Sequence, residues 1–452
     1  MDKQHENPLG VEPINHLMAR FAIPSIIAML VSALYNMVDQ FFIGHSVGMQ
    51  GNAATNVAFP LTITCTAVSL LFGIGGAANF NLSMGRKKPE EAKHFIGNAI
   101  FLMLSFGITL CLLVFLFLDP LLKLFGATED ILTYSRTYTS ITAFGFPFVI
   151  LATGGSNLVR ADGSPNFSMA CTLIGCLINL VLDPLFIFVF HMGMAGAAWA
   201  TIIGQIISAS MVIWYLTRFK TVKLTLKELR PRGFACRRIL SLGMSPFLNQ
   251  LAIMIVQVVM NNVLVFYGGQ SVYGSEIPLA CAGIISKVNM IFFSISIGLS
   301  QGMQPIASFN YGAENYGRVR EAVIKTMTAS TLICTVAFIL FQLFPRQITG
   351  IFGSGSEEYF TFASRYFRIF LFFTFLNGIQ PVAGNFFTAI GKPVYGIFIS
   401  LTRQILFLLP LILILPRFFG IDGVLYSAPI ADFMAAVLAF FLTFRQLNKL
   451  GK

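Results

Sequence analysis

The chain has 452 residues, of which 56% are hydrophobic and only 11% are charged. Water-soluble domains usually have about 25% charged residues, so this composition excludes a soluble globular protein. The net charge of +11 is concentrated in a few loops and in the C-terminal tail. That distribution argues against a nucleic-acid-binding surface, and we predict an all-α polytopic membrane protein.

Apolar segments long enough to cross roughly 30 Å of hydrocarbon as helices recur along the whole chain. In chain order, the twelve predicted transmembrane helices are residues 17–43, 55–83, 92–118, 131–158, 165–190, 194–217, 239–266, 278–309, 320–344, 359–388, 393–415 and 422–444. The one long polar connection lies in the middle of the chain. We therefore predict an N-terminal six-helix lobe (1–217), a basic linker (218–238) and a C-terminal six-helix lobe (239–452).

The distribution of basic residues predicts the orientation in the membrane. The loop RKKPEEAK (86–93) and the linker are rich in Lys and Arg, whereas the loops 45–55 and 268–278 contain neither. Loops that are rich in Lys and Arg remain in the cytoplasm. We therefore expect the linker and both termini to be cytoplasmic.

The two halves of the sequence repeat each other. SMGRKKPEEA (83–92) corresponds to NYGAENYGRV (310–319), and NLVRADGSPNF (157–167) corresponds to NFFTAIGKPVY (385–395). Because each half contains six helices, both copies have the same orientation in the membrane. Many secondary transporters bind substrate between such repeats, so we expect the two six-helix repeats to surround a central cavity.

Five motifs together indicate a family resemblance. They are the helix from Pro24 to Gly44, SMGRKKPEEA, ADGSP (161–165), NLVLDPLFIF (179–188) and GMAGAAWAT (193–201). Over its whole length the sequence resembles the multidrug and toxic compound extrusion (MATE) family, in particular the prokaryotic branch with a cation site in the N-terminal lobe. The resemblance implies an antiporter in the cell (inner) membrane of a bacterium or archaeon. Such an antiporter exports organic cations or drugs by alternating access in exchange for Na⁺ or H⁺.

Three acidic residues lie well inside predicted spans, away from the span ends, namely Asp39, Asp183 and Asp432. A charged side chain at this depth costs about 2.5–3.5 kcal/mol on insertion scales, so each acid needs a partner or a function. We expect Asp432, near the inner part of the last span, to be a partner in helix packing. Asp39 and Asp183 lie in the outer half of the N-terminal lobe, as counting 1.5 Å per residue from the helix ends shows.

Three neutral side chains lie near these two acids in depth: Tyr138 and Thr201 in the same outer half, and Asn179 one turn deeper than Asp183. Asn179 is one turn from Asp183 on the same helix face. Two carboxylates with neutral oxygens suit a hard monovalent cation or a shared proton, and the family resemblance implies the same residues. We predict that these five side chains bind the coupling Na⁺ or H⁺, and we expect no other cofactor.

The repeat provides an internal comparison for this site. Asp39 aligns with Asn261, and Asp183-Pro184 aligns with Leu409-Pro410. The proline is present in both copies but the acids are not, which favours a dedicated site over a structural role. The alternative is that the acids are protonated and join helices by hydrogen bonds. Pro184 lacks an N–H and leaves a carbonyl free, so we predict a hinge there.

Adaptable apolar side chains suit a pocket for cationic amphiphiles. The residues predicted to line the substrate cavity are Tyr35, Met37, Phe146, Met254, Gln257, Lys287 and Met290. Lys287 and Arg403 lie well inside predicted spans. Each is either a counter-ion in the C-terminal lobe or a side chain that reaches the membrane surface.

Three other functions are considered. An enzyme is disfavoured because no His/Asp cluster, Ser/His pair or Gly-rich phosphate loop occurs at membrane depth. A flippase for lipid-linked headgroups, the main alternative, requires a strongly cationic cavity, and only Lys287 and Arg403 favour it. Paired repeats with proline inside a span suit alternating access better than a passive channel.

Because one chain contains both lobes, we expect a monomer that contacts the lipid bilayer and a small cationic amphiphile, and no nucleic acid.

Overall fold

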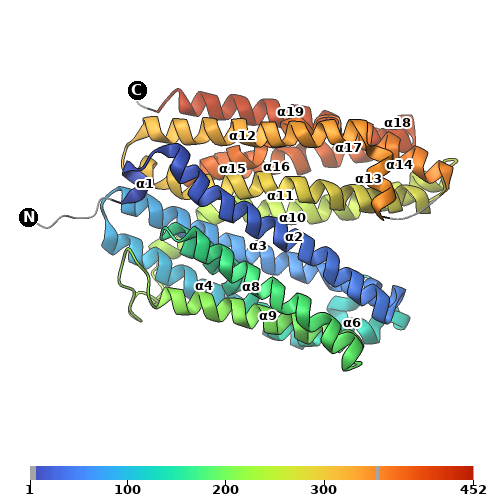
Figure 1. The fold of residues 1–452 in the computed structure, drawn as a ribbon, viewed down its shortest axis with the longest axis horizontal. Helices are drawn as coiled ribbons and strands as arrows, with labels where there is room; N and C mark the ends of the chain where they lie inside the picture. Colours follow the sequence, from blue (N-terminus) through green and yellow to red (C-terminus); the bar gives the residue numbers. More distant parts are fainter. Residues whose placement is uncertain (1–6, 353–355, 451–452) are drawn as a thin grey trace, which may run out of the picture.

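The computed structural model describes residues 7–352 and 356–450, and within these ranges the chain is helical and contains no β-strand. Two helical lobes lie side by side, as Figure 1 shows. The N-terminal lobe contains α1 (Pro8–Val11), α2 (Ile14–Val47), α3 (Met49–Gly85), α4 (Pro89–Leu116), α5 (Leu118–Leu124), α6 (Glu129–Phe144), α7 (Phe146–Ala161), α8 (Pro165–Pro184), η1 (Leu185–Val189) and α9 (Gly193–Leu216).

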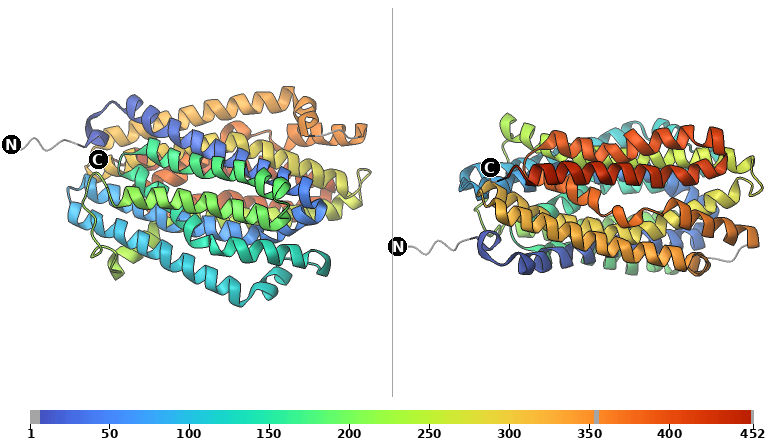
Figure 2. Two further views of the ribbon diagram at one scale, coloured as in Figure 1. Left: turned by 60° about the horizontal axis from the view of Figure 1, so that its bottom comes forward. Right: turned by 90° about the horizontal axis from the view of Figure 1, so that it is seen from above.

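The C-terminal lobe follows the same plan. It contains α10 (Gly233–Gly269), α11 (Glu276–Gly312), α12 (Tyr316–Leu343), α13 (Pro345–Phe352), α14 (Glu357–Phe370), η2 (Thr374–Leu376), α15 (Ile379–Ala389), α16 (Pro393–Leu401), η3 (Thr402–Leu408), α17 (Leu409–Ile414), α18 (Pro416–Phe419) and α19 (Ile421–Leu447). The long helices of both lobes run along the same axis in all three views (Figures 1 and 2).

The predicted all-α polytopic fold is confirmed. In the described part of the chain, ten helical segments are long and apolar enough to cross a membrane, and two bent pairs bring the number to twelve. One pair is α6 and α7, which meet at an angle of 54°. Pro147 lies in the first turn of α7, where it is compatible with a helix start but not with a continuous helix. The other pair is α14 and α15, bent by 42°.

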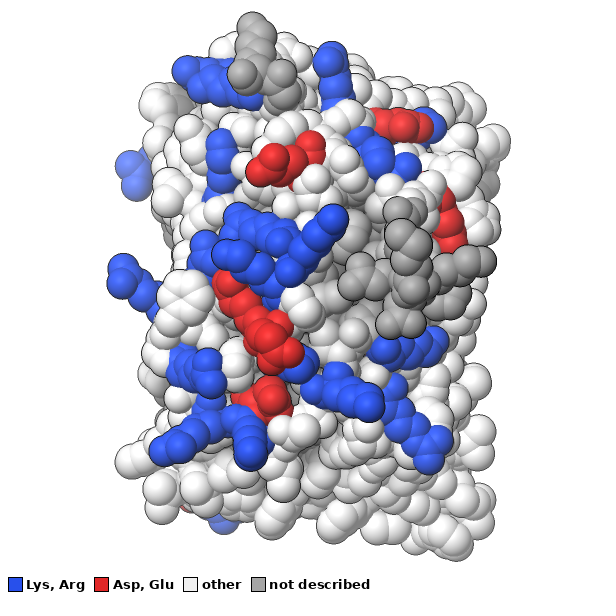
Figure 3. Space-filling view, turned by 90° about the vertical axis from the view of Figure 1, so that its left-hand side faces the viewer, with Lys and Arg blue, Asp and Glu red and all other residues white. Residues whose placement is uncertain are grey.

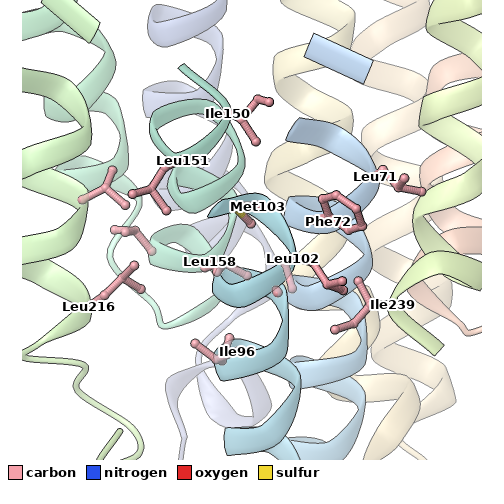
Figure 4. Packing of buried hydrophobic residues seen from close by; sticks show 14 of the residues in the cluster. Leu71, Phe72, Ile96, Leu102, Met103, Ile150, Leu151, Leu158, Leu216 and Ile239 are labelled. Atoms are coloured by element: carbon pink, nitrogen blue, oxygen red, sulfur yellow. The ribbon is translucent and has the colours of Figure 1, made fainter. Parts of the chain in front are cut away.

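Large apolar side chains fill the interior of the N-terminal lobe, as Figure 4 shows. They come from α3, α4, α7 and α9, and include Phe72, Met103 and Leu158, which are fully buried. Ile239 of α10 belongs to the same cluster, so the start of the C-terminal half packs on the N-terminal lobe. Because the surrounding medium is itself apolar, close packing rather than exclusion of water stabilises this arrangement.

The polar segment between the lobes is held by two buried side chains. Asp162, in the ADGSP motif, accepts hydrogen bonds from the backbone N–H groups of Lys220 (2.7 Å) and Thr221 (3.0 Å). Asn98 of α4 accepts from the N–H of Arg232 at 2.7 Å and donates to the carbonyl of Glu228 at 3.1 Å. Helix α10 begins at Gly233, inside the segment 218–238 that the sequence assigns to the linker.

One end of the molecule carries the linker, the loops after α3 and α11, and the start and end of the described chain. Figure 3 views this end, where Lys and Arg greatly outnumber Asp and Glu. We call it the basic end. Here Arg318 of the C-terminal lobe donates to the carbonyls of Glu12 (2.6 Å) and Leu9 (3.2 Å), which fixes α1 across the two lobes.

The lobes are also in direct backbone contact from the basic end inward. Gly85 and Gly312, at the ends of α3 and α11, leave no space for a side chain because each lies against the backbone of the other lobe. Gly298 lies about 21 Å farther along α11, at 1.5 Å per residue, and a Cβ atom there would lie 2.6 Å from the Cα of Ile26. This contact closes the space between the lobes at the basic end.

Candidate functional site

A cavity of about 510 Å³ lies between the lobes, a size typical of pockets for drug-sized molecules. Side chains from α2, α3, α6, α7, α8 and α9 line it on one side, and side chains from α10, α11, α15, α16 and η3 on the other. A central cavity between the two lobes agrees with the expectation from the repeat.

Two of the residues predicted for the substrate cavity, Tyr35 and Phe146, line it. The other five do not belong to its lining: Met37, Met254, Gln257, Lys287 and Met290. Lys287 and Met290 are exposed on α11, and Gln257 donates instead to Asn261, one turn further along α10, at 3.1 Å. The cavity wall on α10 is formed by residues nearer the basic end, among them the polar Asn249 and Gln250.

The five side chains predicted to bind a cation do come together. Asp39 of α2 and Asp183 of α8 are buried, with 9% and 1% of their surface exposed, and their carboxyl groups lie close enough to interact. Asn179, one turn before Asp183, donates to Asp183 Oδ1 at 3.5 Å and to Thr201 Oγ1 of α9 at 3.2 Å. Tyr138 of α6 lines the cavity together with Asp39, Asn179 and Thr201.

Three oxygen atoms in this cluster are buried and have no hydrogen-bond donor in the structure: Asp39 Oδ1, Asn179 Oδ1 and Asp183 Oδ2. Among the described residues, no Lys, Arg or His forms a salt bridge with either carboxylate. Buried polar atoms normally have a partner, and three acceptors from two helices form a site that suits a cation or a proton.

Close packing of α8 against α9 sets the geometry of the Asn179 to Thr201 bond. A Cβ atom on Gly204 would lie 2.6 Å from the carbonyl oxygen of Gly175, and one on Gly175 would lie 3.0 Å from that of Gly204. Only glycine permits the two backbones to approach so closely. Asn179 and Thr201 lie about one turn from these glycines, so their short side chains can meet.

Helix α8 changes its winding immediately after the acid. Pro184 ends the α-helical part, and residues Leu185–Val189 continue as a π-helical turn, η1. Proline lacks the N–H that would bond the carbonyl of Leu180, and π-turns occur frequently at functional sites. The segment beside Asp183 is therefore less tightly bonded than a continuous α-helix.

The acid in the C-terminal lobe has a different environment. Asp432 of α19 is 2% exposed, accepts from Arg403 Nε at 2.6 Å and accepts from Asn377 Nδ2 at 3.0 Å. The sequence left open whether Arg403 is a counter-ion or reaches the membrane surface. The structure shows that it is the counter-ion of Asp432, so this acid has both a charge partner and a hydrogen-bond donor.

The comparison with known protein families agrees with this geometry. The MatE family model matches residues 24–185 and 251–414, one segment in each lobe. The chain belongs to the MATE family. It is 26% identical to the multidrug export protein MepA of Staphylococcus haemolyticus (strain JCSC1435) over 434 residues, which are 96% of this chain and 94% of that protein.

Solved structures show the same fold. A MOP superfamily transporter from Pyrococcus furiosus superposes with a TM-score of 0.92 at 21% sequence identity and covers 100% of both chains. The outward-facing conformation of a multidrug resistance MATE family transporter superposes with a TM-score of 0.90 at 22% identity, covering 98% of this chain and 99% of that one. The chain is thus a multi-pass membrane protein with the MATE fold of two repeated halves.

The sequence did not predict one of the charged residues that line the cavity of this MATE protein. Arg160 lies at the end of α7, lines the cavity and is only 7% exposed. It precedes the ADGSP motif, and a basic residue at a span end is usually at the membrane surface. The sequence signal that distinguishes it is its counterpart in the repeat, Thr388, which is uncharged.

Proposed function

We propose that this MATE protein is a multidrug efflux antiporter that exchanges external Na⁺ or H⁺ for organic cations. The observation that carries the proposal is the pair of contacting carboxyl groups, Asp39 and Asp183, with three unpaired oxygens and no basic partner among the described residues. The MepA relatives are named as multidrug export proteins, which supports the substrate class. Both the transport and the absence of enzymatic activity are part of the proposal.

Electrostatics explains how such a pair responds to a cation. Two carboxylates in contact repel each other strongly when both are charged, so the empty site holds a proton or recruits a cation. Na⁺ or H⁺ neutralises the pair and satisfies the unpaired oxygens of Asp39, Asn179 and Asp183. The site therefore has two states that differ in charge, which is what a coupled exchanger needs.

The helices that carry the site transmit this change to the cavity. Asp39 lines the cavity itself, and Asp183 lies next to Pro184 and the π-helical turn η1. A change in the contacts of Asp183 acts on the part of α8 where Pro184 removes a backbone hydrogen bond. We propose that bending at Pro184 changes the shape of the N-terminal side of the cavity and releases the drug.

The direction of exchange follows from the basic end. Basic loops are cytoplasmic, so the basic end faces the cytoplasm and both termini lie there. The lobes touch from this end inward, through Gly85, Gly312 and Gly298. We propose that the described conformation is closed on the cytoplasmic side and that cations reach the coupling site from outside. One chain supplies both lobes, and we propose that it acts as a monomer.

The geometry gives less support to the flippase alternative. A strongly cationic cavity was the expected mark of that function, but Lys287 does not line the cavity, and the charge of Arg403 is neutralised by Asp432 at 2.6 Å. Among the described residues, this leaves Arg160 as the one basic residue of the cavity lining without a salt bridge.

The test is efflux of ethidium from proteoliposomes that contain the purified chain. A Na⁺ gradient and a H⁺ gradient are imposed separately, and an ionophore that collapses each gradient provides the control. We expect ethidium to move against its own concentration gradient under at least one of the two. Efflux that proceeds equally with both gradients collapsed would overturn the proposal of exchange.

A further inference from the structure

Arg160 is a buried basic residue in the wall of the cavity. Its guanidinium donates from Nη1 to Asn157 Oδ1 at 3.2 Å and to Gln301 Oε1 at 3.1 Å, and both acceptors are uncharged amide oxygens. Its Nε has no hydrogen-bond partner. Within residues 7–352 and 356–450, no carboxylate forms a salt bridge with it.

A buried guanidinium without a carboxylate is unusual. Arginine remains charged in proteins, and buried charges are normally paired because loss of hydration is costly. Arg403, the other arginine of the cavity wall, follows this rule through Asp432. Arg160 does not. Its Nη2 donates to no described residue and is not among the fully buried unpaired atoms, and the residue lines a cavity large enough for a drug-sized molecule.

The position of Arg160 relative to Asp39 can be derived from the contacts of Gln301. The side chain of Gln301 contacts both Arg160 (3.1 Å) and the sulfur of Met29 on α2 (3.8 Å). Met29 and Asp39 are ten residues apart on the same helix, which corresponds to about 15 Å. The cavity thus has a positive group at its floor, near the closed basic end, and a negative group about 15 Å farther out.

We infer that the floor of the cavity is a carboxylate-binding subsite, formed by the guanidinium of Arg160, for elongated zwitterionic drugs whose ammonium group points toward Asp39. The guanidinium donates to the carboxylate in a charge-assisted hydrogen bond, and the cationic end of the drug occupies the space that leads to the cation site. This inference rests on the proposed function, because it deepens the substrate class of the same cavity.

The repeat supports a dedicated role for this residue. Thr388 stands at the corresponding place in the C-terminal half and donates to the carbonyl of Gly384 within its own helix at 3.1 Å. Helix packing at this position therefore needs no arginine. The alternative is that Arg160 only joins the lobes through Gln301, as a contact that opens during transport.

Equilibrium dialysis of the purified full-length chain in detergent, without any gradient, separates these roles. The probes are norfloxacin, a fluorescent zwitterion with its ammonium and carboxylate at opposite ends, and its ethyl ester, which keeps only the ammonium. The variants are Arg160→Gln, the charge-preserving Arg160→Lys, and Gln301→Ala, which removes the contact between the lobes but retains the guanidinium.

We expect the wild-type chain to bind the acid more tightly than the ester by about tenfold or more, as for one charged hydrogen bond. Arg160→Gln abolishes this preference by weakening acid binding alone, whereas Arg160→Lys and Gln301→Ala retain most of it. Equal binding of acid and ester by the wild type would overturn the inference without any variant. An equal loss for both probes in Arg160→Gln and in Gln301→Ala would also overturn it, and would assign Arg160 to the contact between the lobes.

The proposed exchange is distinguishable in the same preparation. If the wild type prefers the acid but no gradient drives ethidium efflux, the exchange proposal fails and the subsite stands. If gradients drive efflux but the preference is absent, the subsite fails and the exchange proposal stands.

Discussion

The two lobes have the same fold, but the acids deep inside their spans have opposite environments. In the C-terminal lobe, each carboxylate oxygen of Asp432 accepts a hydrogen bond, one from Arg403 and one from Asn377. In the N-terminal lobe, Asp39 and Asp183 contact each other and leave oxygens unpaired. A buried ion pair fixes structure in one state, whereas an unpaired cluster gains free energy only when a cation or proton binds. The comparison assigns stability to one lobe and coupling to the other.

The largest expected effect comes from removal of charge in the N-terminal lobe. Asp183→Asn keeps the shape of the side chain but leaves a single carboxylate, so occupancy by Na⁺ or H⁺ no longer switches the pair. We expect gradient-driven ethidium efflux to fall by about 100-fold, as for loss of a charged group that acts in coupling. The measurement is the initial efflux rate from proteoliposomes with equal protein content. Efflux within twofold of the wild type would make Asp183 a structural residue.

The second prediction concerns the ion pair of the C-terminal lobe. Asp432→Asn leaves the partly buried guanidinium of Arg403 without a counter-charge, which costs up to about 3–5 kcal/mol. We expect a clear drop in the thermal unfolding midpoint of the detergent-purified protein. The double variant Asp432→Asn with Arg403→Gln removes both charges and is expected to recover most of the stability. A double variant less stable than the single one would contradict a simple charge pair.

A smaller effect is expected from the neutral ligand of the cluster. Asn179→Ala removes the unpaired Oδ1 and the bond to Thr201 but leaves both carboxylates. We expect the concentration of coupling cation needed for half-maximal efflux to rise by about tenfold, as for loss of one hydrogen-bonding or ligand group. Titration of the driving cation at constant ethidium measures this change. An unchanged cation dependence would remove Asn179 from the site.

The smallest effect is expected when an acid is placed in the other lobe. Asn261, the counterpart of Asp39, is substituted by Asp in the inactive Asp39→Asn background. We expect no recovery, with efflux within twofold of that background. The counterpart of Asp183 in the C-terminal lobe is Leu409, so a new carboxylate at position 261 has no second acid with which to form a coupled pair. Recovery of efflux would show that the repeats are functionally interchangeable.

Much of the fold follows directly from the sequence. The apolar segments predict all twelve spans, since the length of an apolar segment can be read from the local composition alone. The bends do not follow as directly. Pro147 marks the bend between α6 and α7, but α14 and α15 are bent by 42° through the turn η2, which contains no proline.

The sequence predicted the cation cluster better than it predicted the cavity lining. Asp39, Asn179, Asp183, Thr201 and Tyr138 could be grouped because depth along a helix is a simple function of residue number. The cavity lining could not, because it depends on the direction in which each helix face turns. Met254 and Lys287 lie at suitable depth but not in the cavity wall, whereas Arg160 was hidden by its place at the end of a span.

The most direct test of the difference between the lobes is one efflux experiment on two variants, Asp183→Asn and the double variant Asp432→Asn with Arg403→Gln. Both are reconstituted in the same lipid, and ethidium efflux is driven by the gradient that is effective for the wild type. We predict that the first variant loses coupled efflux while the second keeps at least half of the wild-type rate. Retained coupling in Asp183→Asn together with its loss in the double variant would place the coupling site in the C-terminal lobe and contradict the assignment.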